Sequence, residues 1–183
     1  EHNKLNNLEN INSFINNNQF KEVCLLLRGK HFMEVGDYKE AISDYSECIN
    51  SEYQLETSLH NRANAYIKSG EFEKAIEDMD TLESLLGEKK IECIYINRGI
   101  ALFYMKTYEE AMKQFDSAIE LNNSIIAYRF KAMIFLELNE LEDATKQINL
   151  AISKEPSFEN YILKIQILLQ NEEILEAEEC LNK

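Results

Sequence analysis

The cysteines and histidines are the residues of this chain that could act as nucleophiles, bind a metal or form disulfides. The four cysteines, separated by 24, 45 and 87 positions, are Cys24, Cys48, Cys93 and Cys180. No C-x-x-C pair, no set of His and Cys at zinc spacing and no secretory leader is present, so the pattern predicts neither a metal site nor a disulfide framework. We expect free, apolar-packed thiols in a reducing compartment, and therefore a cytoplasmic location.

The sequence also lacks the motifs that carry common catalytic chemistry. It has no G-x-G-x-x-G, no P-loop, no H-E-x-x-H and no G-x-S-x-G. Its many carboxylates stand at helix-surface spacing, as in the favourable i,i+4 pairs of Glu109 with Lys113 and Glu142 with Lys146. We therefore predict that this chain is not an enzyme and needs no cofactor.

Charge and composition narrow the class further. The chain has 183 residues, with 33 acidic and 19 basic side chains and a formal net charge of −14. This balance argues against nucleic acid as a partner, because phosphate binding needs clustered Lys and Arg. No apolar run is long enough to cross a bilayer, so membrane insertion is not expected. One Pro and five Gly supply too few turns for a chain of hairpins, which favours helices.

A repeated segment organises most of the chain. The run G-D-Y-K-E-A-I that begins at Gly36 recurs as G-E-F-E-K-A-I from Gly70, and three more divergent copies follow. The alanines of the five copies, spaced by 34, 36, 33 and 33 residues, are Ala41, Ala75, Ala111, Ala144 and Ala177. Such a period predicts stacked copies of one structural unit.

Each copy has two apolar stripes at helical spacing, separated by a polar break. Twelve residues before the alanine stands a small residue in the first four copies, namely Gly29, Ala63, Gly99 and Ala132. Large apolar residues stand nine before the alanine and four after it. The pattern predicts a helix, a tight turn and a second helix, and the small residues predict a close crossing of the two helices.

These residues resemble the tetratricopeptide repeat (TPR) family, and the resemblance extends over about residues 22–183. It implies an all-α fold, a right-handed α-solenoid of about five helix-turn-helix repeats near 22–55, 56–89, 92–124, 125–157 and 158–183. The Asn-rich residues 1–21 would form an additional amphipathic helix or a tail. Two residues are inserted near Gly87, which predicts a change of register between the second and third repeats. Since the chain begins at Glu1 rather than Met, we expect it to be a piece of a longer protein.

The resemblance also implies a binding surface, because the first helices of TPR pairs line a groove. At about 100° per residue, positions 2, 5, 9, 12 and 13 of each repeat share one face. The predicted peptide-binding groove comprises His60, Asn64, Ile67, Ile96, Asn97, Ile100, Phe103, Tyr104, Arg129, Met133 and Leu136. An alternative is that some of these side chains only pack against neighbouring helices.

A basic residue recurs at position seven of all five copies. The series is Arg28, Arg62, Arg98, Lys131 and Lys164. Position seven lies away from the groove, so we expect these side chains to pair with carboxylates of the second helices, such as Asp44 and Asp78. Arg129 is the arginine outside this series, and it is a candidate for binding a partner's carboxylate.

The predicted function is that of a non-catalytic scaffold or adaptor, which binds a peptide or helix of a partner protein in the groove. One alternative is a heat-shock co-chaperone type of TPR domain. In such domains a clamp of Asn, Lys and Arg side chains binds two carboxylates of the partner. This chain has Asn64 and Asn97 at the two Asn positions of the clamp, but His60, Ile126 and Phe130 at its three cationic positions. A second alternative is that the chain is a regulatory region of a larger enzyme. A third is self-association through the C-terminal end, where apolar residues would be left uncovered.

Overall fold

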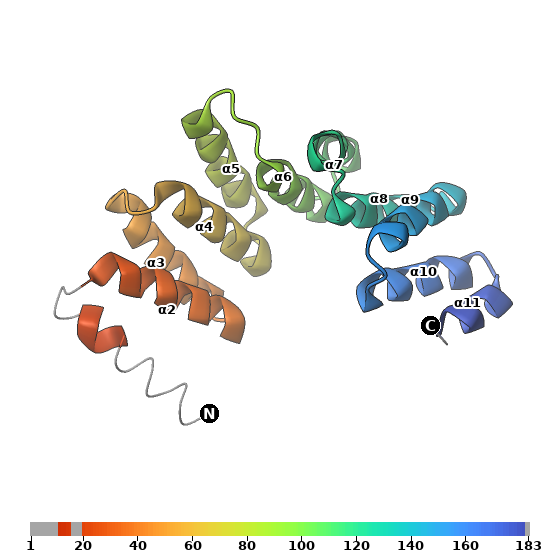
Figure 1. Cartoon of the computed structure of the whole chain (residues 1–183), viewed down its shortest axis with the longest axis horizontal. Coiled ribbons are helices and arrows are strands. Elements are labelled where there is room, and N and C mark those ends of the chain that lie inside the picture. The colour runs from red at the N-terminus through yellow and green to blue at the C-terminus, as the bar shows by residue number, and fades with distance from the viewer. Residues whose placement is uncertain (1–10, 16–19, 182–183) are drawn as a thin grey trace. The chain divides into compact units, whose positions relative to one another are not determined.

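The computed structural model describes residues 11–15 and 20–181, and within them it is all-α (Figure 1). Residues 11–15 are helical, while the remainder of the predicted 1–21 segment before Phe20 lies outside the described residues. The helices that follow are α2 (Lys21–Val35), α3 (Tyr38–Asn50), α4 (Leu55–Ser69), α5 (Phe72–Leu86), α6 (Glu92–Tyr104), α7 (Tyr108–Asn122), α8 (Ile125–Glu137), α9 (Leu141–Lys154), α10 (Phe158–Gln170) and α11 (Ile174–Leu181). The predicted fold class, a series of helix-turn-helix repeats, is confirmed.

A residue with left-handed backbone conformation joins the two helices of each pair. Gly36 and Gly70 hold this position in the first two pairs, with φ of 88° and 84°, where glycine has no steric penalty. The later pairs use Lys106, Asn139 and Glu172 instead, with φ of 61–62°. The tight turn predicted by the polar break is therefore present in all five pairs, including the three that have no glycine at this position.

The chain divides into two compact units, residues 1–90 and 91–183, and the division falls directly after the insertion near Gly87. In the first unit α2 packs on α3, α3 on α4 and α4 on α5, and α2 also contacts α4. Ala41 and Tyr45 of α3 and Ala65 of α4 form a buried core of this unit. First helices thus lie beside first helices, with second helices behind them.

The second unit repeats the same arrangement with α6 to α11. Here α6, α8 and α10 are the first helices, and α8 contacts both of the others. Aromatic rings fill the core: Phe130 of α8 stacks on Phe115 of α7, with ring centroids 5.4 Å apart, and meets Phe103 of α6 edge-on at the same distance. These rings fix α6 and α8 side by side, which matters for any surface that the two helices share.

The predicted close crossings occur at the small residues. A Cβ atom built on Gly99 would lie 2.6 Å from the ring of Phe115, and one built on Gly29 would lie 2.7 Å from the ring of Tyr45. Ala63 and Ala132, at the same place in their repeats, are completely buried. The small side chains let the second helix of each pair place its large residue against the first helix.

Three of the basic residues at position seven, Arg28, Arg62 and Lys131, pair with carboxylates of second helices. Arg98 and Lys164 donate to the amide oxygens of Gln114 and Asn149. Arg62 donates from Nε and Nη2 to the Asp78 carboxylate at 2.9 and 2.6 Å, and Arg28 binds Asp44 in the same way at 2.8 and 2.7 Å. Both carboxylates are buried, and each raises the pKa of its arginine through these hydrogen bonds. The ion pairs therefore belong to the scaffold.

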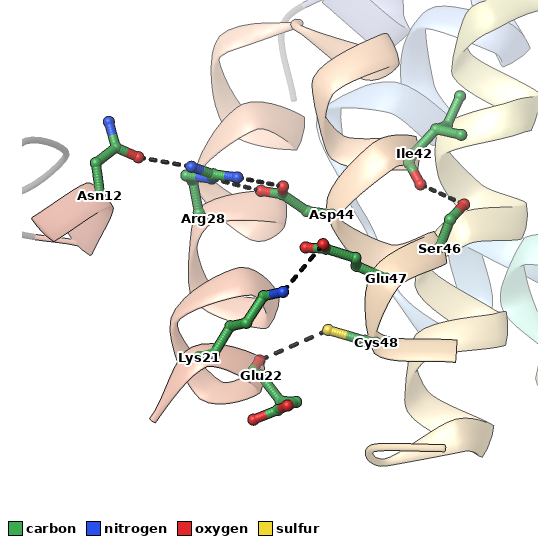
Figure 2. Close-up of polar contacts among 9 residues, drawn as sticks. All are labelled: Asn12, Lys21, Glu22, Arg28, Ile42, Asp44, Ser46, Glu47 and Cys48. Carbon is green, nitrogen blue, oxygen red and sulfur yellow. Dashed lines mark hydrogen bonds and ion pairs between the residues drawn. The ribbon is translucent and has the colours of Figure 1, made fainter. Parts of the chain in front are cut away.

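The remaining guanidinium nitrogen of Arg28, Nη1, contacts residues 11–15, and the same nitrogen of Arg62 contacts α3. Arg62 Nη1 donates to Ser46 Oγ of the preceding second helix at 3.0 Å, and Arg28 Nη1 donates to Asn12 Oδ1 at 2.6 Å (Figure 2). Asn12 and Ser46 are one repeat length, 34 residues, apart. Residues 11–15 thus contact α2 as the second helix of a preceding repeat would.

Candidate functional site

The predicted groove residues of the first unit lie along one face of α4. His60, Asn64 and Ile67 are all half-buried. Asn64 Nδ2 lies 3.1 Å from His60 Nε2, a distance at which the neutral imidazole accepts a hydrogen bond from the amide. Burial lowers the pKa of His60, which favours that neutral form. The face therefore presents an uncharged ring and amide.

The predicted groove residues of the second unit divide into buried and accessible groups. Ile96 and Phe103 of α6 are buried in the core shared with α7 and α8, and Asn97 is buried too. Ile100 and Met133 pack against that core from its edge. For Ile96 and Phe103 the structure thus favours the alternative, in which the side chain holds neighbouring helices together.

The accessible residues lie on the three first helices of the second unit, α6, α8 and α10. Tyr104 of α6 is 51% exposed and Ile126 of α8 is 40% exposed, while Arg129 and Leu136 of α8 are half-buried. The fifth copy adds Ile162 and Leu169 of α10, at positions 5 and 12, with 37% and 54% exposed. We call this surface the A face, defined by Ile100, Tyr104, Ile126, Arg129, Met133, Leu136, Ile162 and Leu169.

Arg129 is the one charged residue among those that define the A face. Within the described part of the chain no hydrogen bond or ion pair joins its guanidinium to another residue. It lines a cavity at the start of α8 together with Ser124 and Asn160, two buried polar residues that the sequence analysis did not select. The periodicity of the repeats carries no signal for these two, because they stand at the helix starts.

The described residues also bear on metal sites, disulfides and membrane-spanning helices. No group of three or more His, Cys, Asp or Glu is placed to hold a metal ion. The four cysteines are free, with Cys93 half-buried and the others buried. No helix in the described ranges combines the length and the apolar character that crossing a membrane requires.

Curated proteins with similar sequences are larger than this chain. It is 29% identical to mouse tetratricopeptide repeat protein 12 over 62% of this chain and 15% of that protein. It is 32% identical to human sperm-associated antigen 1 over 49% of this chain and 10% of that protein. Human RNA polymerase II-associated protein 3 is 29% identical, over 55% of this chain and 15% of that protein. The chain thus spans a small part of each of these relatives.

Solved structures share the fold at low sequence identity. A thermophilic TPR protein of Thermus thermophilus matches with a TM-score of 0.75 and 19% identity, over 87% of both chains. PilW, a type IV pilus biogenesis factor, matches with a TM-score of 0.79 and 12% identity, over 93% of this chain and 79% of that one.

The family comparison matches the repeats themselves. Residues 56–85 and 94–125 fit the tetratricopeptide repeat model, and these segments cover α4–α5 and α6–α7. The five alanines, the left-handed turns and the helix pairs carry the same period through the chain. The comparisons therefore indicate that residues 56–85 and 94–125 are tetratricopeptide repeats, and they support the same family for the helix pairs around them.

Proposed function

We propose that this chain is a non-catalytic interaction module that binds a polypeptide segment of a partner protein on the A face. The observation that carries the proposal is the exposure of apolar side chains on all three first helices of the second unit. Tyr104, Ile126, Ile162 and Leu169 each keep more than a third of their surface in contact with solvent. An amphipathic helix or an extended apolar segment gains free energy by covering such side chains.

The polar contact in this proposal comes from Arg129. Its guanidinium has five N–H donors and no partner among the described residues, so it can bind a carbonyl or carboxylate of the segment. Asn64 and Asn97, the two amides of the predicted groove, are less available, because Asn64 already contacts His60 and Asn97 is buried. Arg129 therefore orients the segment while the apolar residues supply the affinity.

The co-chaperone alternative has less support from the residues. A clamp for acidic tails needs cations, and the positions in question hold His60, Ile126 and Phe130. Phe130 is buried among aromatic rings, and burial favours the neutral form of His60. A regulatory role within a larger enzyme, a cytoplasmic location and self-association through α11 stay predictions.

Affinity capture from a native lysate tests the proposal. The variant Tyr104→Ser with Ile126→Ser removes two exposed apolar groups of the A face without opening the core. The matched control is Leu121→Ser with Leu150→Ser, which changes side chains 41% and 42% exposed on the second helices α7 and α9. We expect the first variant to lose its specific partner and the control to retain it. Equal capture by both variants would contradict the proposal.

A further inference from the structure

A cavity of about 430 Å³ opens in the second unit where α8 and α10 begin. Ile125 and Ile126 of α8 supply its apolar wall. Its polar lining, from the starts of α6, α8 and α10 and the turn before α10, includes Glu92, Ser124, Arg129, Glu155, Glu159 and Asn160. Because Ile126 and Arg129 also belong to the A face, a segment bound there would pass over this cavity.

Two buried side chains of the lining have oxygens without hydrogen-bond partners. Asn160 is 1% exposed, and its Nδ2 donates to the backbone carbonyl of Glu155 at 2.9 Å, which fixes the amide orientation and leaves Oδ1 without a donor. Ser124 is 4% exposed, and its Oγ neither caps α8 nor meets another partner. Buried polar atoms are nearly always paired, so both oxygens indicate a polar ligand. The Ser124 hydroxyl can donate or accept, but Asn160 Oδ1 can only accept, so the group that meets it must be a donor.

The charges around the cavity point to the same chemistry. Glu92, Glu155 and Glu159 line it against a single cation, Arg129. Glu92 accepts a hydrogen bond from Asn122, whereas the side chains of Glu155 and Glu159 form no hydrogen bond or ion pair with a described residue. The positive ends of α8 and α10 offset only part of this negative charge. A cationic donor group therefore matches the lining better than an anion does.

We propose that this cavity binds the basic side chain, lysine or arginine, of the partner polypeptide, an inference that rests on the proposed function. The cationic head lies between Glu155 and Glu159 and donates to Asn160 Oδ1. Its aliphatic stem packs on Ile125 and Ile126, and Arg129 donates to a main-chain carbonyl of the same segment. The A face thereby selects segments that carry a basic residue.

NMR titration of the full chain with Nα-acetyl-lysine amide and Nα-acetyl-arginine amide tests this inference. We expect both probes to shift the Ser124 backbone and Asn160 side-chain amide signals, and Nα-acetyl-norleucine amide to shift neither. Replacing Glu155→Gln and Glu159→Gln together should weaken binding about fivefold, the effect of a partly exposed ion pair. Glu140→Gln with Glu142→Gln, an equal charge change at the start of α9, should leave the affinity unchanged.

Two outcomes would overturn the inference. One is the absence of any shift with the basic probes, which would leave the cavity filled by water alone. The other is tighter, Arg129-dependent binding of Nα-acetyl-glutamate amide, which would make it an anion site. If the basic probes fail while partner capture still depends on Tyr104 and Ile126, only this inference fails. If the probes bind but capture is unaffected by the A-face variant, the proposed function fails.

Discussion

Replacing Gly99 by alanine tests how the helix pairs are held together, because two opposing effects meet at this position. In a helix interior alanine is more favourable than glycine by about 1 kcal/mol. The new Cβ, however, would lie 2.6 Å from Cε1 of Phe115 and 2.9 Å from Cδ1 and Cζ of the same ring. Gly99→Ala is therefore stabilising by propensity and destabilising by packing, and the structure decides which effect is larger.

The ring of Phe115 cannot move away at low cost. It is completely buried and stacked on Phe130, so relief of the contact requires α6 and α7 to separate. Overpacking of this kind costs about 1–3 kcal/mol, and a contact this short belongs near the upper limit. After the gain in helix propensity, we expect Gly99→Ala to lower the free energy of unfolding by about 1–2 kcal/mol.

The double variant separates the two effects. With Phe115→Leu in place, the ring is gone and Gly99→Ala should become neutral or stabilising by up to about 1 kcal/mol. Urea unfolding followed by circular dichroism gives the free energies, and hydrogen exchange of the α6 and α7 amides localises the change, since repeat proteins can unfold in parts. The pair Gly29→Ala and Tyr45→Leu repeats the test in the first unit. A stabilising Gly99→Ala in the wild-type background would refute the reasoning.

Three further predictions concern charge and ionisation. Arg62→Met leaves the buried Asp78 carboxylate without its partner, so urea unfolding should show a loss of about 3 kcal/mol, and a loss below about 0.5 kcal/mol would contradict the role assigned to the ion pair. Burial lowers the folded-state pKa of His60 below the ordinary value of 6.5, so its contribution to stability is present above pH 6.5 and is lost as pH falls below 6.5 toward the folded-state pKa. Wild type should therefore lose more stability than His60→Gln between about pH 7.5 and 5.5, and parallel curves would oppose this. Burial raises the pKa of Cys48 to about 11, so iodoacetamide at about pH 8 should modify it more slowly than the half-buried Cys93 in the native chain, a difference that urea should abolish.

The sequence pattern predicts the scaffold because every repeat has the same packing requirements. Regularly spaced alanines mark the places where second helices pack, and small residues such as Gly99 mark close crossings. The pairing of Arg28 with Asp44 also follows from the pattern, because position seven points away from the groove and toward the second helices. Each of these inferences depends only on contacts within one repeat.

The binding surface depends on contacts between repeats, and these are harder to predict. The helical wheel places Phe103 and Tyr104 on one face, but Phe103 is buried against Tyr108 of α7 and Phe130 of α8, whereas Tyr104 stays half exposed. How deeply a side chain is covered depends on the rings of the next repeat, which a wheel does not include. Ser124 and Asn160 lie at helix starts, where the orientation of the chain is set by the preceding turn. Sequence spacing therefore gave no indication of the cavity that they line.

Hydrogen exchange of the chain with and without its captured partner tests the central claim most directly. If a polypeptide covers the A face, binding should slow exchange in the first helices α6, α8 and α10, and most strongly around Ile126 and Arg129. The second helices α7 and α9 should exchange as they do in the unbound chain. Protection confined to α7 and α9, or to the first unit, would contradict the account.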